Sequence, residues 1–233
     1  MNERLNSMPY LAYLQAFEKT LKETDTTFGH FEIIRAKDYD RADRFFAEHL
    51  LEDEPSCKPL GVGMNTTMRK MFMYFLTQDM SLMLLHPDTN EIIAIRVMGL
   101  GNDDPPPPES IDDEPMKTLV TLWNYCDERA KFFDHYKIKE AVIFFGIGVA
   151  KEYRNRGLAT EIMKTTLSFL KNMNASPLYV KGGTASKYAA NIFDKCGFKL
   201  LDELRYDEYI VDGQQVICNT GTHESLRSYG KVI

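Results

Sequence analysis

The feature that most constrains the fold is a ten-residue apolar run that leads into a basic turn. The run EAVIFFGIGV, Glu140 to Val149, carries no charge after its first residue, which is typical of a strand covered on both faces. An amphipathic helix is predicted over 158–171 because apolar residues recur at helical spacing along it. Its apolar side comprises Ala159, Ile162, Met163, Thr166, Leu167 and Leu170. The sequence therefore predicts a strand–turn–helix unit over 140–171.

The turn between this strand and helix has the composition of a phosphate-binding site. Gly157, at the helix junction, lets the backbone approach a ligand closely, because it has no Cβ. The first N–H groups of the helix lack intrahelical acceptors, and the helix dipole favours an anion beside them. Arg154 and Arg156 add positive charge that can pair with phosphate. We therefore expect residues 154–160 to hold a pyrophosphate.

Two common phosphate motifs do not fit the chain. No glycine pair is followed by the lysine of a Walker loop. A dinucleotide fingerprint would need a third glycine where GVGMNT has Thr66 and GIGVAK has Lys151. The phosphate ligand must therefore be of another kind.

The rest of the chain reads as one mixed α/β domain. Its 233 residues are 44% hydrophobic, and no break in composition divides them. Helices are predicted over 9–22, 39–51, 66–77, 116–134 and 184–198. Strands are predicted over 30–36 and 177–183, with hairpins over 81–99 and 198–219, the second turning at Asp212-Gly213. Pro55 should end the helix over 39–51 before Glu54.

Charge and composition exclude several classes of function. The net charge of −6 argues against a nucleic-acid partner, which needs a basic surface. The acidic excess suits either a cationic small molecule or solubility alone. Residues 101–115 hold four consecutive prolines and six acidic residues. They predict a surface loop, or alternatively a lid or an acidic rim over a site for cations.

The cysteines and histidines do not indicate a metal site. The four cysteines have no C-x-x-C spacing and the five histidines form no i, i+4 pair, so we expect no metal. We find neither a signal-peptide pattern nor a run of about 20 apolar residues. We therefore expect a cytoplasmic protein with reduced thiols and no membrane partner.

The segment YRNRGLA matches R-x-x-G-x-A, and this chain therefore resembles the GCN5-related N-acetyltransferase (GNAT) superfamily, in which that motif is the coenzyme A pyrophosphate loop. The setting of strand, helix, strand PLYV, helix and DKCGF supports the resemblance, which covers Phe31 to about Ile217. Within the superfamily, DEP at Asp53 to Pro55 and the later KYAANIFDKCGF resemble the insect arylalkylamine N-acetyltransferases.

The resemblance implies a fold and a domain organisation. The fold would be α+β, a three-layer α/β/α arrangement whose mixed, mostly antiparallel central sheet contains splayed parallel strands. Residues 1–233 would form a single domain. It would comprise a helical extension over 1–28, a core over 31–217, the acidic loop over 101–115 and a tail over 218–233.

The resemblance also implies the cofactor and the residues of the site. Acetyl-CoA would be the co-substrate, the thioester carbonyl would be polarised by a main-chain amide of the strand, and no metal would take part. The cofactor residues would be Ile147, Gly148, Val149, Arg154, Asn155, Arg156, Gly157, Leu158, Ala159, Thr160 and Asn191. Glu54 would be the general base and Tyr188 a substitute general acid, with Asp53 and Ser186 on the substrate side. A base is useful because, with a pKa near 10, only roughly one alkylamine in a thousand is unprotonated at pH 7.

The chain departs from the insect pattern in several places. The D-E-P-L-N motif continues here with Ser56 and Cys57, and Ala185 and Ala189 stand where relatives often have serines. Phe193 stands where many relatives have the tyrosine that protonates the leaving group. Three alternatives therefore stay open for what we expect to be a monomer: acetylation of an arylalkylamine such as dopamine, tyramine, serotonin or octopamine, acetylation of a polyamine or other amine, or binding of acetyl-CoA without turnover.

Overall fold

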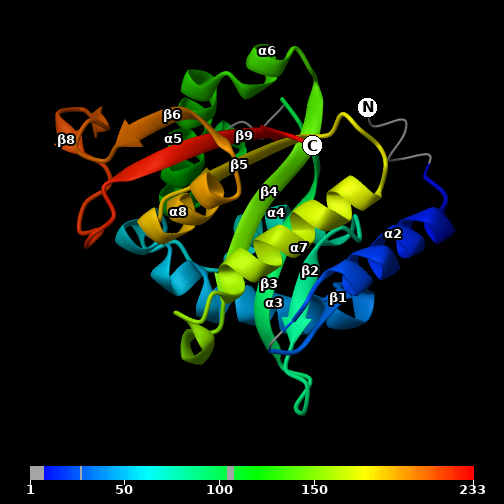
Figure 1. Ribbon diagram of the computed structural model, residues 1–233. Coiled ribbons are helices and arrows are strands. Elements are labelled where there is room, and N and C mark those ends of the chain that lie inside the picture. Colours follow the sequence, from blue (N-terminus) through cyan, green and yellow to red (C-terminus); the bar gives the residue numbers. More distant parts are fainter. Residues whose placement is uncertain (1–7, 27, 104–107) are drawn as a thin grey trace.

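The computed structural model describes residues 8–26, 28–103 and 108–233 and is built around one seven-stranded sheet (Figure 1). The strand order is β1-β2-β3-β4-β5-β9-β6, and β4 and β5 are the one parallel pair of neighbours in that sheet. The strands are β1 (His30–Ile33), β2 (Leu82–Leu85), β3 (Ile92–Asn102), β4 (Glu140–Val149), β5 (Tyr179–Thr184), β6 (Lys199–Arg205) and β9 (Ser225–Val232). Strands β7 (Ile210–Val211) and β8 (Gln214–Gln215) form a separate small hairpin.

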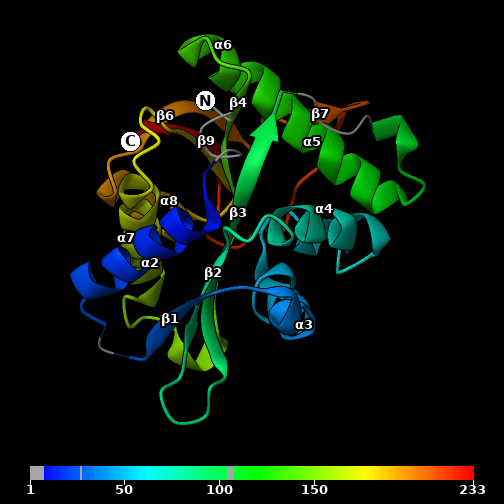
Figure 2. The same cartoon turned by 90° about the vertical axis from the view of Figure 1, so that its right-hand side faces the viewer.

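Helices cover both faces of the sheet, which confirms the predicted three layers (Figure 2). One face carries α2 (Tyr10–Glu23), α7 (Leu158–Asn172) and α8 (Lys187–Lys195). The other carries α3 (Tyr39–His49), α4 (Thr66–Leu76) and α5 (Glu114–Ala130). Strand β2 is buried on both faces, with Leu82 and Leu84 in the first core and Met83 and Leu85 in the second.

The parallel strands β4 and β5 diverge after a short shared stretch. Their paired residues are Val142 with Val180, Ile143 with Lys181 and Phe144 with Gly182. On its other side β4 stays paired with β3 as far as Val149, with an irregularity that leaves Phe145 without a register partner. The β5-facing edge of β4 is therefore open from Phe145 to Val149, which is the splayed arrangement predicted.

One predicted helix is divided in two. We expected a single helix over 116–134, but α5 ends at Ala130 and α6 (Phe132–Tyr136) follows it. Lys131 between them has a left-handed backbone, with φ of 46°, which ends the helical ladder of α5.

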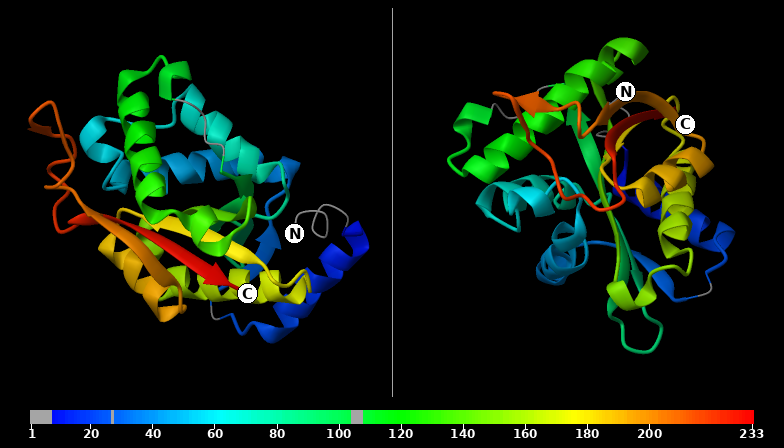
Figure 3. Two further views of the ribbon diagram at one scale, coloured as in Figure 1. Left: turned by 90° about the horizontal axis from the view of Figure 1, so that it is seen from above. Right: turned by 90° about the vertical axis from the view of Figure 1, so that its left-hand side faces the viewer.

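The predicted closing hairpin and C-terminal tail are also wrong in part. Asp212 and Gly213 do form the turn between β7 and β8, with φ of 50° and 76°. However, β6 pairs with β9 from the expected tail, and β9 lies between β5 and β6 (Figure 3). The sheet therefore extends to Val232, beyond the core boundary expected at residue 217.

The expected N-terminal extension is integrated into one helical layer. Phe17 of α2 is buried and meets the ring of Phe169 of α7 edge-on, with 5.3 Å between ring centroids. Residues 1–7 lie outside the described residues, as do residues 104–107 of the acidic proline loop. In the described part of that loop, Ile111 is buried and the carboxylate of Asp113 caps α5 by accepting from Met116 N–H at 2.8 Å.

Candidate active site

A cleft of about 1220 Å³ opens where β4 and β5 diverge. Its walls come from β4, β5, the turn before α7, the start of α8, and the segment that follows α3. It is lined by fourteen of the fifteen predicted site residues, all except Arg156, so these residues are brought together in one place.

The turn before α7 presents main-chain donors. Among the described residues, none accepts a hydrogen bond from the N–H groups of residues 155–159. The amides on either side are used: Arg154 N–H donates to Lys151 O at 3.4 Å and Thr160 N–H to Gly157 O at 2.9 Å. A run of free amides at the start of a fifteen-residue helix favours an anion.

Gly157 gives this turn its shape. It precedes α7 with a left-handed φ of 84°, a conformation that strains any other residue. A Cβ built at this position would meet no atom within 4 Å, so the space beside the glycine is open. The turn can therefore accept a bulky anion.

The two arginines of the motif do not use their side chains as we expected. The guanidinium of Arg154 donates to Val149 O at 3.2 Å, to His49 O at 2.7 Å and to the carboxylate of Asp53 at 2.8 Å. Arg156 does not line the cleft: its guanidinium donates to Glu152 O at 3.2 Å and lies over the ring of Tyr153. Both side chains therefore bond to the turn and its neighbours, and the free amides are the donors that the turn leaves available to an anion.

Asp53 is the charged partner of Arg154. It ends the short 3-10 helix η2 (Leu51–Asp53), opposite η5 (Lys151–Tyr153), which begins the turn. The hydrogen bond from Arg154 lowers the pKa of Asp53 below its usual value. A second ion pair joins Lys151 of η5 to Glu52 of η2. These two ion pairs hold residues 52–53 against residues 151–154, at the start of the turn before α7.

Glu54 differs from its neighbour Asp53. Pro55 ends the helical segment, as predicted, and Glu54 is extended, with φ of −68° and ψ of 119°. Its carboxylate lies in the cleft wall and accepts from Ser56 Oγ at 3.2 Å. Burial raises the pKa of Glu54 to about 7, although the hydrogen bonds from Ser56 oppose the rise. A carboxylate with this pKa can take a proton near neutral pH.

The cleft has an aromatic wall. It comprises Phe46, Tyr74, Phe75, Trp123 and Phe145, and Lys70 of α4 also lines the cleft.

The other acids of this cleft are already paired. Asp127 bonds to Lys181 at 2.6 Å and Asp53 to Arg154. Of the described acids that line the cleft, Glu54 is the one without a basic partner.

Helix α8 contributes the remaining predicted residues. The Ser186 hydroxyl caps the helix by accepting from Tyr188 N–H at 3.3 Å. Tyr188 is 63% exposed and meets His223 edge-on, and Asn191 is also exposed. Phe193, by contrast, is buried, so it brings a ring and no hydroxyl to the cleft.

Among the cleft residues that were not anticipated from the sequence, His223 and Arg96 carry polar groups that bear on the chemistry. His223 lies in the segment expected to be a tail, and its Nδ1 accepts from Lys187 N–H at 3.2 Å. Arg96 is the single charged residue in the run IIAIRVMG of β3, a signal that could have identified it.

Arg96 is unusual in its surroundings. The residue is 1% exposed, and Nε and Nη2 are buried with no hydrogen-bond partner among the described residues. Its guanidinium carbon lies 3.7 Å from the centroid of the Phe144 ring and 6.0 Å from that of Phe193. Burial lowers the pKa of Arg96 well below its usual value. A desolvated cation–π contact contributes about 2 kcal/mol, less than the several kcal/mol that burying an unpaired charge costs.

The described residues contain no group of three or more His, Cys, Asp or Glu side chains placed to hold a metal ion. Within the same residues, every helix is too short or too polar to cross a membrane.

Comparison with known proteins gives the class of this chain. Residues 106–198 match the model of the acetyltransferase (GNAT) family. Together with the splayed sheet, this match confirms the predicted resemblance to the GNAT superfamily.

Several solved structures share the fold. One is arylalkylamine N-acetyltransferase 2 from Aedes aegypti, with a TM-score of 0.80, 19% identity, and coverage of 88% of this chain and 98% of that one. Mosquito arylalkylamine N-acetyltransferase like 5b has a TM-score of 0.76 at 13% identity, covering 87% and 99%. A Drosophila melanogaster polyamine N-acetyltransferase that forms N-acetylagmatine has a TM-score of 0.73 at 18% identity, also covering 87% and 99%. At these identities the likeness is one of fold.

Proposed function

We propose that this protein is an acetyl-CoA-dependent N-acetyltransferase that acts on the primary amine of a small molecule. The observation that carries the proposal is one cleft that combines free amides at residues 155–159, an open edge of β4 and the unpaired carboxylate of Glu54. The amides suit the diphosphate of coenzyme A. The open edge suits the amide groups of its pantetheine arm, which can pair with it as an added strand.

The chemistry is a direct transfer. Glu54 takes a proton from the substrate ammonium, and the amine nitrogen attacks the carbonyl carbon of the thioester. A main-chain amide within Ile147–Val149 stabilises the oxygen that becomes negative. Formation of the C–N bond leaves the nitrogen positively charged. As the C–S bond breaks, this nitrogen loses a second proton to Glu54, which has passed the first to solvent, and coenzyme A leaves as the thiolate. Cys57 is not needed as a nucleophile, and burial raises the pKa of its thiol.

We infer an arylalkylamine as the substrate class. The aromatic wall suits a flat ring, and Glu54 suits one ammonium group. A polyamine or agmatine would bring a second cation, and the other acids of the cleft lining, Asp53 and Asp127, are paired with Arg154 and Lys181. Acetylation of polyamines is therefore the second candidate, supported by the fold shared with the polyamine enzyme.

The test is a thiol-release assay with acetyl-CoA against a panel of arylalkylamines, polyamines and amino acids, together with calorimetric titration of coenzyme A. We expect binding of coenzyme A, and turnover with tyramine or dopamine at a kcat/KM at least tenfold above that with spermidine or agmatine. A preference for spermidine or agmatine would favour the second candidate, acetylation of polyamines. Binding without release for any amine would instead identify a module that has lost turnover.

A further inference from the structure

We propose that Arg96 is the cation that stabilises the sulfur of coenzyme A as the thiolate leaves, in the place that a tyrosine hydroxyl would otherwise fill. This inference rests on the proposed function, because it assigns a further catalytic residue to the same cleft.

The place of Arg96 in the sheet is the first argument. Arg96 pairs with Ile147 across β3 and β4, and its guanidinium lies over Phe144 on the face covered by α7 and α8. Phe144 is the last residue of β4 that pairs with β5. A Cβ on its β5 partner, Gly182, would meet the ring of Phe193 and the Cβ atom of Phe144. The guanidinium therefore lies at the inner end of the cleft, where the two strands separate.

The length of the cofactor arm is the second argument. A pantetheine arm has about eleven chain atoms between its phosphate oxygen and its sulfur, roughly four residues of extended chain. An arm that begins at the amides of residues 155–159 and follows the open edge of β4 from Val149 would end near Phe145. The sulfur would then lie beside the ring on which Arg96 is stacked.

The charges of the cleft are the third argument. Arg96 has no carboxylate partner among the described residues, and the titratable group that acts on it there is the thiol of Cys196. Burial lowers the pKa of Arg96, but the pKa of arginine starts so far above neutral that the side chain keeps its positive charge in a protein. This cation therefore needs an anion to balance it. Glu54 lies by Cys57, in the core on the opposite face of the sheet. The base and the cation thus lie on the amine side and the sulfur side of the thioester.

The role is consistent with the balance of the reaction. As the C–S bond breaks, its electron pair stays on sulfur, and the second proton of the attacking nitrogen goes to Glu54, which has already passed the first to solvent. Arg96 neither gives nor takes a proton. It stabilises the thiolate, which receives a proton from solvent after release. Phe193 cannot provide a proton, because its side chain is a hydrocarbon ring.

The experiment measures the ionisation of bound coenzyme A. The ultraviolet absorbance of the thiolate is followed from pH 5 to 10 in the complexes of the wild type, Arg96→Met and Arg96→Lys. The matching complexes with desulfo-coenzyme A, which lacks the sulfur, serve as blanks for the protein's own thiols. A free thiol has a pKa near 8.5.

We expect the wild type to lower the pKa of the bound thiol by at least one unit. At pH 8 it should therefore prefer coenzyme A to desulfo-coenzyme A by at least about threefold. Arg96→Met should lose this preference and Arg96→Lys should keep part of it. In turnover, Arg96→Met should lower kcat about 10- to 100-fold and leave the KM of the amine little changed.

An unshifted thiol pKa in the wild-type complex would overturn the proposal, and this measurement needs no variant to fold. Equal shifts in the wild type and Arg96→Met would also overturn it. A loss of kcat in Arg96→Met that is confined to amines carrying a carboxylate would also overturn it, because Arg96 would then be a substrate ligand. A shifted thiol pKa without turnover would support the role of Arg96 while contradicting the proposed function, so the two failures are distinguishable.

Discussion

The charges at the mouth of the cleft differ from those in its interior. At the mouth, Asp53 pairs with Arg154 and Glu52 with Lys151, and the four side chains are between 36% and 60% exposed. In the interior, Glu54 and Arg96 have no oppositely charged partner among the described residues.

This difference separates charges that hold the structure from charges available to a ligand. Exposed ion pairs contribute about 0–1 kcal/mol each, so the mouth can lose one pair at little cost. Buried groups without a partner lower stability and are found preferentially at functional sites. We therefore expect changes in the interior to affect catalysis strongly and changes at the mouth to affect it weakly.

The largest effect is expected from Glu54→Gln. Loss of a general base should lower kcat about 10²- to 10⁴-fold, with coenzyme A binding retained. In the wild type, kcat/KM should rise with pH through the pKa of Glu54, which burial raises to about 7. The variant should lack this rise.

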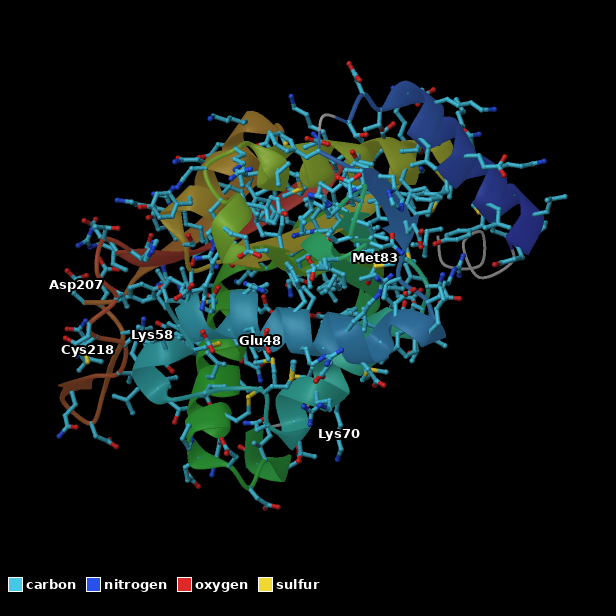
Figure 4. All side chains as sticks on the ribbon, turned by 90° about the horizontal axis from the view of Figure 1, so that it is seen from below. Glu48, Lys58, Lys70, Met83, Asp207 and Cys218 are labelled. Carbon is cyan, nitrogen blue, oxygen red and sulfur yellow. The ribbon has the colours of Figure 1, made fainter. Side chains whose placement is uncertain are left out.

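The matched control for that variant is Glu48→Gln, because Glu48 is an exposed carboxylate on the lower side of α3 (Figure 4). It should behave as the wild type. Equal turnover by Glu54→Gln and the wild type across the pH range would remove Glu54 as the base.

The second largest effect is expected on coenzyme A binding, from a change in the turn of residues 154–160 before α7. Gly157→Ala places a Cβ in the open space beside the free amides and strains a left-handed residue. Because hydrogen bonds to charged groups contribute about 1.5–3 kcal/mol, displacing one should raise the dissociation constant of coenzyme A by roughly tenfold or more. Calorimetric titration measures this change.

Gly213→Ala is the control, because Gly213 has a similar φ of 76° in the β7–β8 hairpin and also has open space beside it. Both variants should lose about the same stability, but coenzyme A binding should fall in Gly157→Ala alone. Equal affinities of Gly157→Ala and Gly213→Ala for coenzyme A would contradict the proposal that this turn binds the diphosphate.

A smaller effect, on stability, is expected from the same change at Glu54. Because the folded protein holds the proton of Glu54 up to a pKa of about 7, ionisation of this group destabilises the fold. The penalty is absent below the unfolded pKa of about 4.3, grows as pH rises, and is complete above 7. Glu54→Gln should therefore be more stable than the wild type by about 1–3 kcal/mol at pH 8 and similar to it at pH 4. Urea denaturation at the two pH values tests this, and a variant less stable at pH 8 would contradict it.

The smallest effect is expected from Asp53→Asn at the mouth. Arg154 lowers the pKa of Asp53, so their pair stabilises the fold above the usual pKa of aspartate and loses this effect as pH falls through the lowered value. Because both side chains are more than a third exposed, we expect a loss below about 1 kcal/mol at pH 7 and none in strong acid. Thermal unfolding measures the loss, and coenzyme A affinity should change less than about fivefold. An effect as large as that of Gly157→Ala would mean that this ion pair is essential to the turn.

The sequence predicted the parts of this site that depend on local signals. The apolar run before the turn, Gly157 at the helix start and Pro55 after Glu54 each act on the backbone within a few residues. The strand, the turn and the position of Glu54 followed from them.

The parts that depend on distant partners were missed or misassigned. Arg154 was predicted to contact phosphate, and its protein partners, Asp53 and His49 O, about a hundred positions earlier in the chain, were not predicted. Strand β9 has a sequence, SLRSYGKV, with a weak apolar pattern, and it is specified by pairing with β5 and β6. The lack of a partner for Arg96 could not be predicted either, because it depends on the aromatic side chains that β4 and α8 place beside the guanidinium.

The central claim is that the main-chain donors of residues 155–159 bind the diphosphate of coenzyme A. The most direct test is to follow the amide resonances of these five residues by NMR during titration with coenzyme A and, separately, with dephospho-coenzyme A, which keeps the diphosphate. We predict large, saturating downfield shifts of these amides with both ligands, since each retains the group that they bind. Saturable binding of coenzyme A that leaves the five resonances unmoved would contradict the account.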